Sequence, residues 1–289
     1  MFDFRYHALS LAGVFLALVV GLLLGVAIGD KELVSSARKD IRNSLRDDVR
    51  RADTERDAAK AQLVAERRYG DKAYPILTAG RLDGRRIGLV LLGSSDVSPG
   101  SVRSWLDPSG ASLSLVAQLR EDVDPEALAE RTRGTRYAQV DSKPGLLRDL
   151  GRRVGFQMVR GGRLIRELRT ALLQTSGEFG GLDGVIVIRP SEQPEDKEKA
   201  KRLDVLQDGI VRGLAQTGVK VVGIEPSDSA PSQIGWYRGR ELSTVDNIDE
   251  IAGRAALVFV LAGADGAFGS RDSAQDLLPP VVAAAPRRP

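Results

Sequence analysis

The sequence predicts a mixed α/β protein: an N-terminal transmembrane helix, a helical coiled-coil stalk, and a layered, mostly parallel α/β domain. Three observations predict it. A long apolar stretch lacks charge, a charge-rich segment without Pro or Gly follows it, and short apolar runs then alternate with helical stretches. The predicted parts are an anchor or signal over 1–29, a stalk over 30–72, a globular domain over 80–280 and a disordered tail over 281–289.

The first element is the apolar stretch. The 22 residues from Ala8 to Gly29 contain no charged side chain, and about 20 apolar residues span a bilayer as a helix. The apolar part of a secretory signal is shorter, roughly 7–15 residues. The length favours a retained single-pass anchor. The small residues of Ala27-Ile28-Gly29 leave a cleaved signal as the alternative.

Small residues recur every fourth position in this stretch, at Gly13, Ala17, Gly21, Gly25 and Gly29. Residues four apart share one face of a helix. In lipid, such a face lets a second helix approach closely. We therefore expect a helix-packing face; the alternative is that Gly and Ala are simply common in membrane helices.

The stalk has the composition of a solvated helix, with mixed charges and sparse apolar positions. Leu45, Ala52 and Ala59 are spaced seven apart, as in a coiled coil. The companion heptad positions are polar, so either a weak paired coil or a single exposed helix fits. Gly70 and Pro75 are expected to mark its end.

Four apolar runs in the remainder read as buried strands, at 85–93, 111–119, 183–190 and 219–226. Helices are expected between and after them, at 125–132, 144–151, 161–175 and 195–216. Residues 245–263 are expected to form a closing helix, with Asp246 and Asn247 as candidate caps.

Two glycine-containing loops are candidate ligand sites. "GSSDVSPGS" (93–101) follows the first strand, where α/β proteins often bind ligands. Its Ser94, Ser95 and Asp96 form the one possible loop site, although a capped strand-to-helix turn is the simpler interpretation. "GADGAFG" (263–269) lacks the dinucleotide spacing and reads as a turn.

Composition excludes several classes of function. The chain has no cysteine, and its only histidine, His7, precedes the apolar stretch. Nucleophile–histidine triads and common zinc sites are therefore excluded from the domain. The net charge is only +3, and basic and acidic residues are interspersed along the chain. Nucleic acid is therefore not an expected partner. We predict no catalytic residues, no metal site and no cofactor, and a protein that is not an enzyme.

Residues 7–25 ("HALSLAGVFLALVVGLLLG") and 243–279 resemble the N- and C-terminal signatures of the actinobacterial copper-transporter (MctB-like) family. The resemblance implies an envelope protein, described as an outer-membrane channel linked to copper homeostasis. It also implies relatives that act with a partner in cell separation. Copper is implied by this resemblance alone, because Met1, His7 and Met158 are the only soft or imidazole ligands.

Three functions fit the sequence. The first is a membrane-anchored, non-catalytic scaffold that self-associates or recruits an envelope partner through helix and coil. The second is a component of copper transport. The third is a carboxylate-dependent envelope enzyme, with Asp96 as its only candidate residue. The expected location is the cell membrane with an extracytoplasmic domain, whereas the resemblance implies the outer membrane.

Overall fold

The computed structural model describes residues 4–29, 33–192 and 194–280. The chain divides into two units, Met1–Glu66 and Arg67–Pro289. The predicted disordered tail, 281–289, lies outside the described residues.

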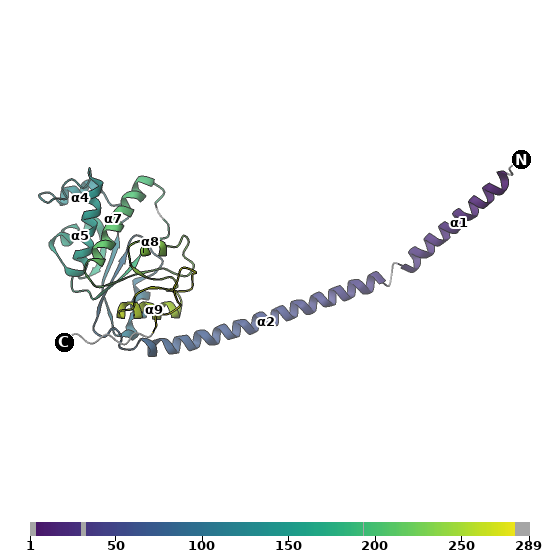
Figure 1. Cartoon of the computed structure of the whole chain (residues 1–289), viewed down its shortest axis with the longest axis horizontal. Helices are drawn as coiled ribbons and strands as arrows, with labels where there is room; N and C mark the ends of the chain where they lie inside the picture. The colour runs from purple at the N-terminus through teal and green to yellow at the C-terminus, as the bar shows by residue number, and fades with distance from the viewer. Residues whose placement is uncertain (1–3, 30–32, 193, 281–289) are drawn as a thin grey trace. The chain divides into compact units, whose positions relative to one another are not determined.

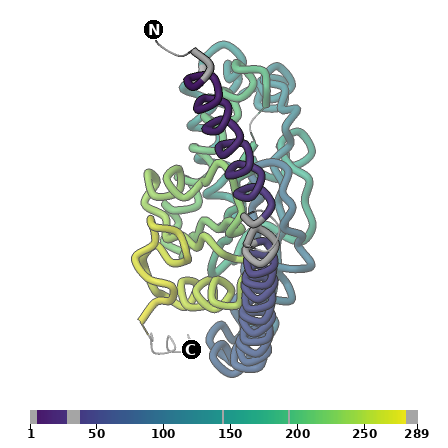
Figure 2. Tube along the Cα trace, turned by 90° about the vertical axis from the view of Figure 1, so that its right-hand side faces the viewer, coloured from purple at the N-terminus to yellow at the C-terminus, as the bar shows by residue number. Residues whose placement is uncertain are grey.

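The first unit begins with α1 (Phe4–Gly29), a single uninterrupted helix (Figure 2). Within the described residues, it is the one helix long and apolar enough to cross a membrane, over Tyr6–Ala27. Its large apolar side chains are exposed, among them Leu16 and Leu22. An apolar helix that packs against no core is suited to a lipid environment.

The second helix, α2 (Leu33–Thr78), confirms the helical part of the stalk prediction. The prediction that the helix ends at Gly70 or Pro75 is wrong. The helix continues to Thr78 because the folded domain holds its last turns. Tyr74 and Thr78 are buried there, and Tyr74 donates to the carbonyl of Trp105. At Gly70, a Cβ would lie 2.8 Å from the Ile251 side chain, so this glycine permits close packing.

The domain is built on a seven-stranded sheet with the order β3-β2-β1-β4-β5-β6-β7. All neighbouring strands are parallel except β3, which is antiparallel to β2. The mostly parallel α/β prediction is confirmed. The strands are β1 (Arg86–Leu91), β2 (Ser112–Leu119), β3 (Leu173–Gly177), β4 (Gly184–Ile188), β5 (Lys220–Ile224), β6 (Ser243–Val245) and β7 (Ala267–Phe268).

Helices cover both faces of this sheet (Figure 1). One core contains buried residues of α4, α5, α6 and α7, and the other contains those of α3, α9 and the end of α2. A sheet buried on both faces explains why β1, β4 and β5 are almost continuously apolar. The helices are α3 (Pro99–Leu106), α4 (Pro125–Arg131), α5 (Pro144–Arg160), α6 (Arg163–Leu172), α7 (Lys197–Ala215), α8 (Ile234–Arg238) and α9 (Ile251–Ala262).

Helices α5 and α7 cross with their backbones in close contact. Gly151 and Gly155 of α5 face α7, while Gly209 and Gly213 of α7 face α5. A Cβ at Gly151 would lie 2.6 Å from the carbonyl oxygen of Leu206. These glycines therefore support the helix pair, and α5 extends to Arg160, beyond the predicted end at residue 151.

The four predicted strands and the closing helix are confirmed, but two details are wrong. Residues 173–175, predicted as the end of a helix, lie in the edge strand β3. Asp246 does not cap α9, whose N-cap residue is Glu250. Instead, the Asp246 carboxylate accepts the backbone N–H of Ser270 at 2.8 Å and occupies the space where a Cβ at Gly269 would lie. The 263–269 turn is thus fastened to the sheet.

Candidate functional site

The strand order creates a switch point between β1 and β4. From β1 the chain moves to β2 on one side, and later returns to place β4 on the other side. In open parallel sheets, the loops leaving the carboxyl ends of two such strands diverge and leave a crevice, the usual ligand site of this architecture.

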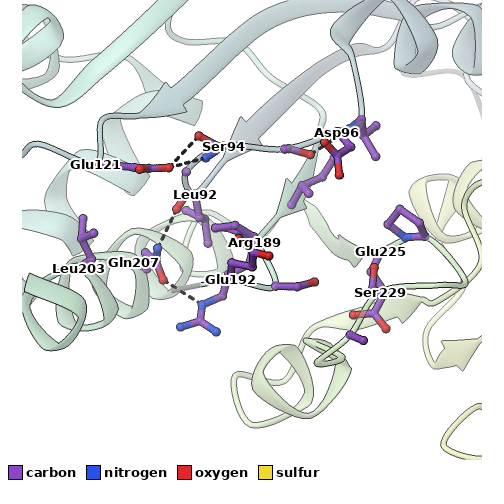
Figure 3. A pocket seen from close by; sticks show the side chains of 18 of the residues that line it. Leu92, Ser94, Asp96, Glu121, Arg189, Glu192, Leu203, Gln207, Glu225 and Ser229 are labelled. Atoms are coloured by element: carbon purple, nitrogen blue, oxygen red, sulfur yellow. Dashed lines mark hydrogen bonds between the residues drawn. The ribbon is translucent and has the colours of Figure 1, made fainter. Parts of the chain in front are cut away.

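A cavity of about 580 Å³ occupies this position. Its floor lies where the loops after β1 and β4 meet, because a Cβ at Gly93 would lie 2.9 Å from the Pro190 ring. Figure 3 shows side chains from several loops arranged around the opening. We call this cavity the crevice; its lining includes Ser94, Ser95, Asp96, Glu121, Arg189, Glu192, Gln207, Glu225 and Asp228.

The loop after β1 already holds a carboxylate. Ser94 donates its backbone N–H (3.1 Å) and its hydroxyl (2.7 Å) to the same oxygen of Glu121 (Figure 3). These two hydrogen bonds lower the pKa of Glu121, because they favour the charged form. In nucleotide-binding folds, backbone N–H groups of the corresponding loop bind a phosphate. Here the Glu121 carboxylate accepts the N–H of Ser94 instead.

The other two residues of the predicted loop site also line the crevice. The Ser95 hydroxyl accepts the backbone N–H of Val97 at 3.2 Å, and Asp96 is exposed. Ser98 caps α3 by accepting the N–H of Ser101. The structure thus brings Ser94, Ser95 and Asp96 together at one side of the cavity, ahead of a capped helix.

Arg189 follows β4 and is the one arginine or lysine lining the crevice within the described residues. Its guanidinium donates to Gln207 (2.9 Å) and to Asp204 (3.0 Å). It also donates to Gln233 and lies 4.7 Å from the centre of the Trp236 ring. The guanidinium of Arg189 is thus bonded to neighbouring protein side chains, and these contacts stabilise the wall of the crevice.

Glu225 follows β5 and is 2% exposed. Its carboxylate accepts from the Ser232 hydroxyl (2.7 Å) and the Gln233 N–H (2.6 Å), and lies 3.0 Å from Arg271 Nε. Burial raises the pKa of Glu225 despite these partners. Arg271 also donates to the carbonyl of Ser229, at 2.6 Å, so it ties the rim loop to the buried acid.

Sequence reasoning missed Glu121, Arg189 and Glu225. The signal that could have found them is their position at the carboxyl end of a parallel strand. Glu121 lies two residues after β2, and Arg189 and Glu225 lie one residue after β4 and β5, inside the predicted runs 183–190 and 219–226. The carboxyl ends of parallel strands meet at one edge of a sheet. Among the described residues, no group of three or more His, Cys, Asp or Glu is arranged to hold a metal ion.

The predicted helix-packing residues lie in α1. A Cβ added at Gly13, Gly21 or Gly25 would meet no atom within 4 Å, so this face is open in the chain by itself. Ala17 is also exposed. Gly29 is the last residue of α1, and its surroundings lie outside the description.

The possible copper ligands are separated. Met158, a residue of α5, is 0% exposed and lies in the core. His7 lies on the exposed helix α1, and Met1 lies outside the described residues. A protein-family model described as "Copper transport outer membrane protein, MctB" matches residues 1–152 and 159–279. No curated protein matches the chain.

Proposed function

The chain belongs to the MctB family of copper transport outer membrane proteins, and from this premise we propose that it is a membrane-anchored, non-catalytic interaction protein of the cell envelope. In this proposal, α1 anchors the chain and pairs with a second membrane helix, either another copy or a partner. Helix α2 forms the stalk as a weak coiled coil, and the domain lies on the extracytoplasmic side. The protein contributes to copper homeostasis through its partner.

The observation that carries the proposal is the open small-residue face of α1, at Gly13, Ala17, Gly21 and Gly25. Close packing between backbones drives helix association in lipid, and small residues four apart permit it. The apolar side chains of α2, such as Ile41, Leu45 and Val49, are likewise exposed. They give the stalk a narrow stripe suited to a second helix.

A non-catalytic role is supported by how the acidic groups of the domain are held. The domain has no His or Cys, and Glu225 is enclosed by Ser232, Gln233 and Arg271. Glu121 is held by Ser94. These groups support the fold around the crevice.

The proposal is tested by crosslinking the full chain in membranes. The double substitution Gly21→Ile with Gly25→Ile keeps the segment apolar, so insertion continues, but it blocks close backbone approach. We expect crosslinked species to fall at least fivefold at equal expression. The control is Leu22→Ile with Leu23→Ile, which changes side chains on the same turns without filling the small-residue face. Equal crosslinking of both double variants would refute the proposal.

Topology has its own test. An extracytoplasmic domain is cleaved by protease added to intact, wall-stripped cells. Complete protection, lost only when the membrane is permeabilised, would place the domain in the cytoplasm instead.

Direct copper transport is the second candidate, and the family match favours it. Copper content of deletion and complemented cells tests the copper role itself. If wild-type and deletion cells accumulate copper equally, the chain has no part in copper homeostasis.

A further inference from the structure

We propose that the crevice binds an organic cation, that is, a ligand carrying an ammonium or guanidinium group on an aliphatic stem. The proposal concerns the domain alone and does not depend on the role assigned to α1. The ligand can be a free small molecule or a basic side chain presented by a peptide, since both carry the same recognised group.

The position and size of the crevice indicate a ligand site. It lies outside the carboxyl ends of β1 and β4, at the switch point of the sheet. Its volume of about 580 Å³ falls within the range of small-molecule pockets, roughly 300–1,000 Å³. The α1 and α2 helices contribute no residue to it, so the domain by itself supplies the wall.

The charge of the lining selects a cation. Asp96, Glu192 and Asp228 line the crevice from three different loops and are exposed. Within the described residues, none of the three forms an ion pair. Arg189, the lining cation, is committed to Asp204, Gln207 and Gln233. The space is therefore bordered by carboxylates without a free positive group, and low-dielectric walls strengthen such a field.

The same lining disfavours anions, including the phosphates that this architecture commonly binds. The Ser94 N–H and hydroxyl, which could receive a phosphate oxygen, both donate to Glu121. A phosphate entering here would displace a carboxylate whose charged form those hydrogen bonds stabilise, and would also face Asp96.

The apolar part of the lining fits an aliphatic stem. Leu92, Val97, Ile188, Pro190 and Pro194 border the crevice beside the carboxylates. Long cationic side chains bury their methylene stems against apolar surface while the charged head contacts polar groups. Figure 3 shows Asp96 and Glu192 beside one opening, which gives a cationic head acceptors from two different loops.

Isothermal titration of the full chain in detergent micelles tests the proposal with four probes. Cadaverine and agmatine represent free cations, the tripeptide Ala-Arg-Ala represents a basic side chain in a peptide, and glutarate is an anion of similar length. We expect one cation per chain and no heat from glutarate. Binding of cadaverine and agmatine alone identifies a free ligand, whereas tighter binding of the tripeptide identifies a peptide.

The variant Asp96→Asn with Glu192→Gln removes two lining charges and keeps the side-chain shapes. We expect it to bind the cation at least tenfold more weakly. Asp141→Asn with Glu130→Gln is the matched control, because both residues are exposed and lie outside the lining. Affinity in the wild type should also fall as salt is raised.

Three results would overturn the proposal. One is the absence of cation binding at millimolar concentration, and another is equal binding of glutarate. The third is equal affinity in the crevice variant and its control. If Ca²⁺ saturates the chain and prevents amine binding, the carboxylates form a metal site instead.

Discussion

Gly155 on α5 lies directly against the backbone carbonyl of Ile210 on α7, with no space between them for a side-chain carbon. Gly213 on α7 has the same relationship to the carbonyl of Arg152 on α5. The contact atoms are backbone atoms of two helices, which cannot move aside as a flexible side chain can. This crossing positions α7, which carries Gln207 into the wall of the crevice.

We therefore expect Gly155→Ala to destabilise the domain. Overpacking in a close-packed interior typically costs about 1–3 kcal/mol, and backbone overlap places this site at the upper end. Gly145→Ala on the same helix is the control, since a Cβ there meets nothing within 4 Å. It should be neutral or stabilising by about 0.5–1 kcal/mol. Urea unfolding of the full chain, followed by tryptophan fluorescence, measures both; equal midpoints would contradict the prediction.

Ser94 controls the ionisation of Glu121. Ser94→Ala removes the hydroxyl hydrogen bond (2.7 Å) and leaves the backbone one. The pKa of Glu121, lowered in the native protein, should rise toward its ordinary value. A carboxyl with a lowered folded-state pKa stabilises the fold above its unfolded pKa and loses that contribution as pH falls through the folded value. The variant should therefore be less stable than the native chain at neutral pH, and this difference should vanish in acid.

Carboxyl ¹³C titration of the Glu121 signal measures this shift directly. Ser104→Ala is the control, because among the described residues the Ser104 hydroxyl bonds only within its own helix, to the carbonyl of Ser101. An unchanged Glu121 pKa in Ser94→Ala would show that the hydroxyl contributes nothing.

The strands could be predicted because burial on both faces leaves a plain trace in sequence. The run 184–188 is buried at every position, and so it reads as continuously apolar. The edge strands leave weaker traces. β3 is mostly exposed (LQTSG), and β6 and β7 have only three and two residues. Their pairing is decided by neighbours distant in the chain, which local periodicity does not report.

The crevice could be predicted only in part, for a related reason. Ser94, Ser95 and Asp96 were found because they follow the first strand. Glu121, Arg189 and Glu225 also lie at strand ends, but the strand order decides that those ends lie beside Ser94, and no local pattern encodes that order. Gly70 and Pro75 misled the prediction of the end of the stalk: both lie inside α2, because packing against the domain holds its last turns.

Arg271 should make stability depend on pH. Arg271→Met leaves the buried Glu225 without the cation that lies 3.0 Å away, so the Glu225 pKa, already raised, should rise further. Below the unfolded pKa the acid is protonated in both states and the variant loses only the Arg271 bonds to backbone carbonyls. As pH rises through that value, the unfolded state ionises first, and the folded state becomes relatively less stable.

The loss in Arg271→Met should thus be larger at pH 8 than at pH 4, measured by urea unfolding at both values. Arg238→Met is the control, since Arg238 bonds the same segment through the carbonyl of Ser273 but forms no ion pair within the described residues. A pH-independent loss in Arg271→Met would show that Glu225 is not what Arg271 stabilises.

The last prediction concerns how a chain of this family handles copper. Cu(I) prefers thiolate and thioether ligands, and the chain has no cysteine, one histidine and two methionines. Met158 is fully buried among apolar side chains, so its thioether fills the core. We expect the full chain in micelles to retain less than one Cu(I) per molecule against a chromogenic chelator.

Met158→Leu should not change that result. It should lower the free energy of unfolding by less than about 1.5 kcal/mol, as volume-conserving core exchanges do. Stoichiometric copper lost on His7→Gln or Met158→Leu would instead identify a direct ligand. Weak retention in all three chains is the result expected if this chain supplies no copper ligand of its own and acts on copper through a partner.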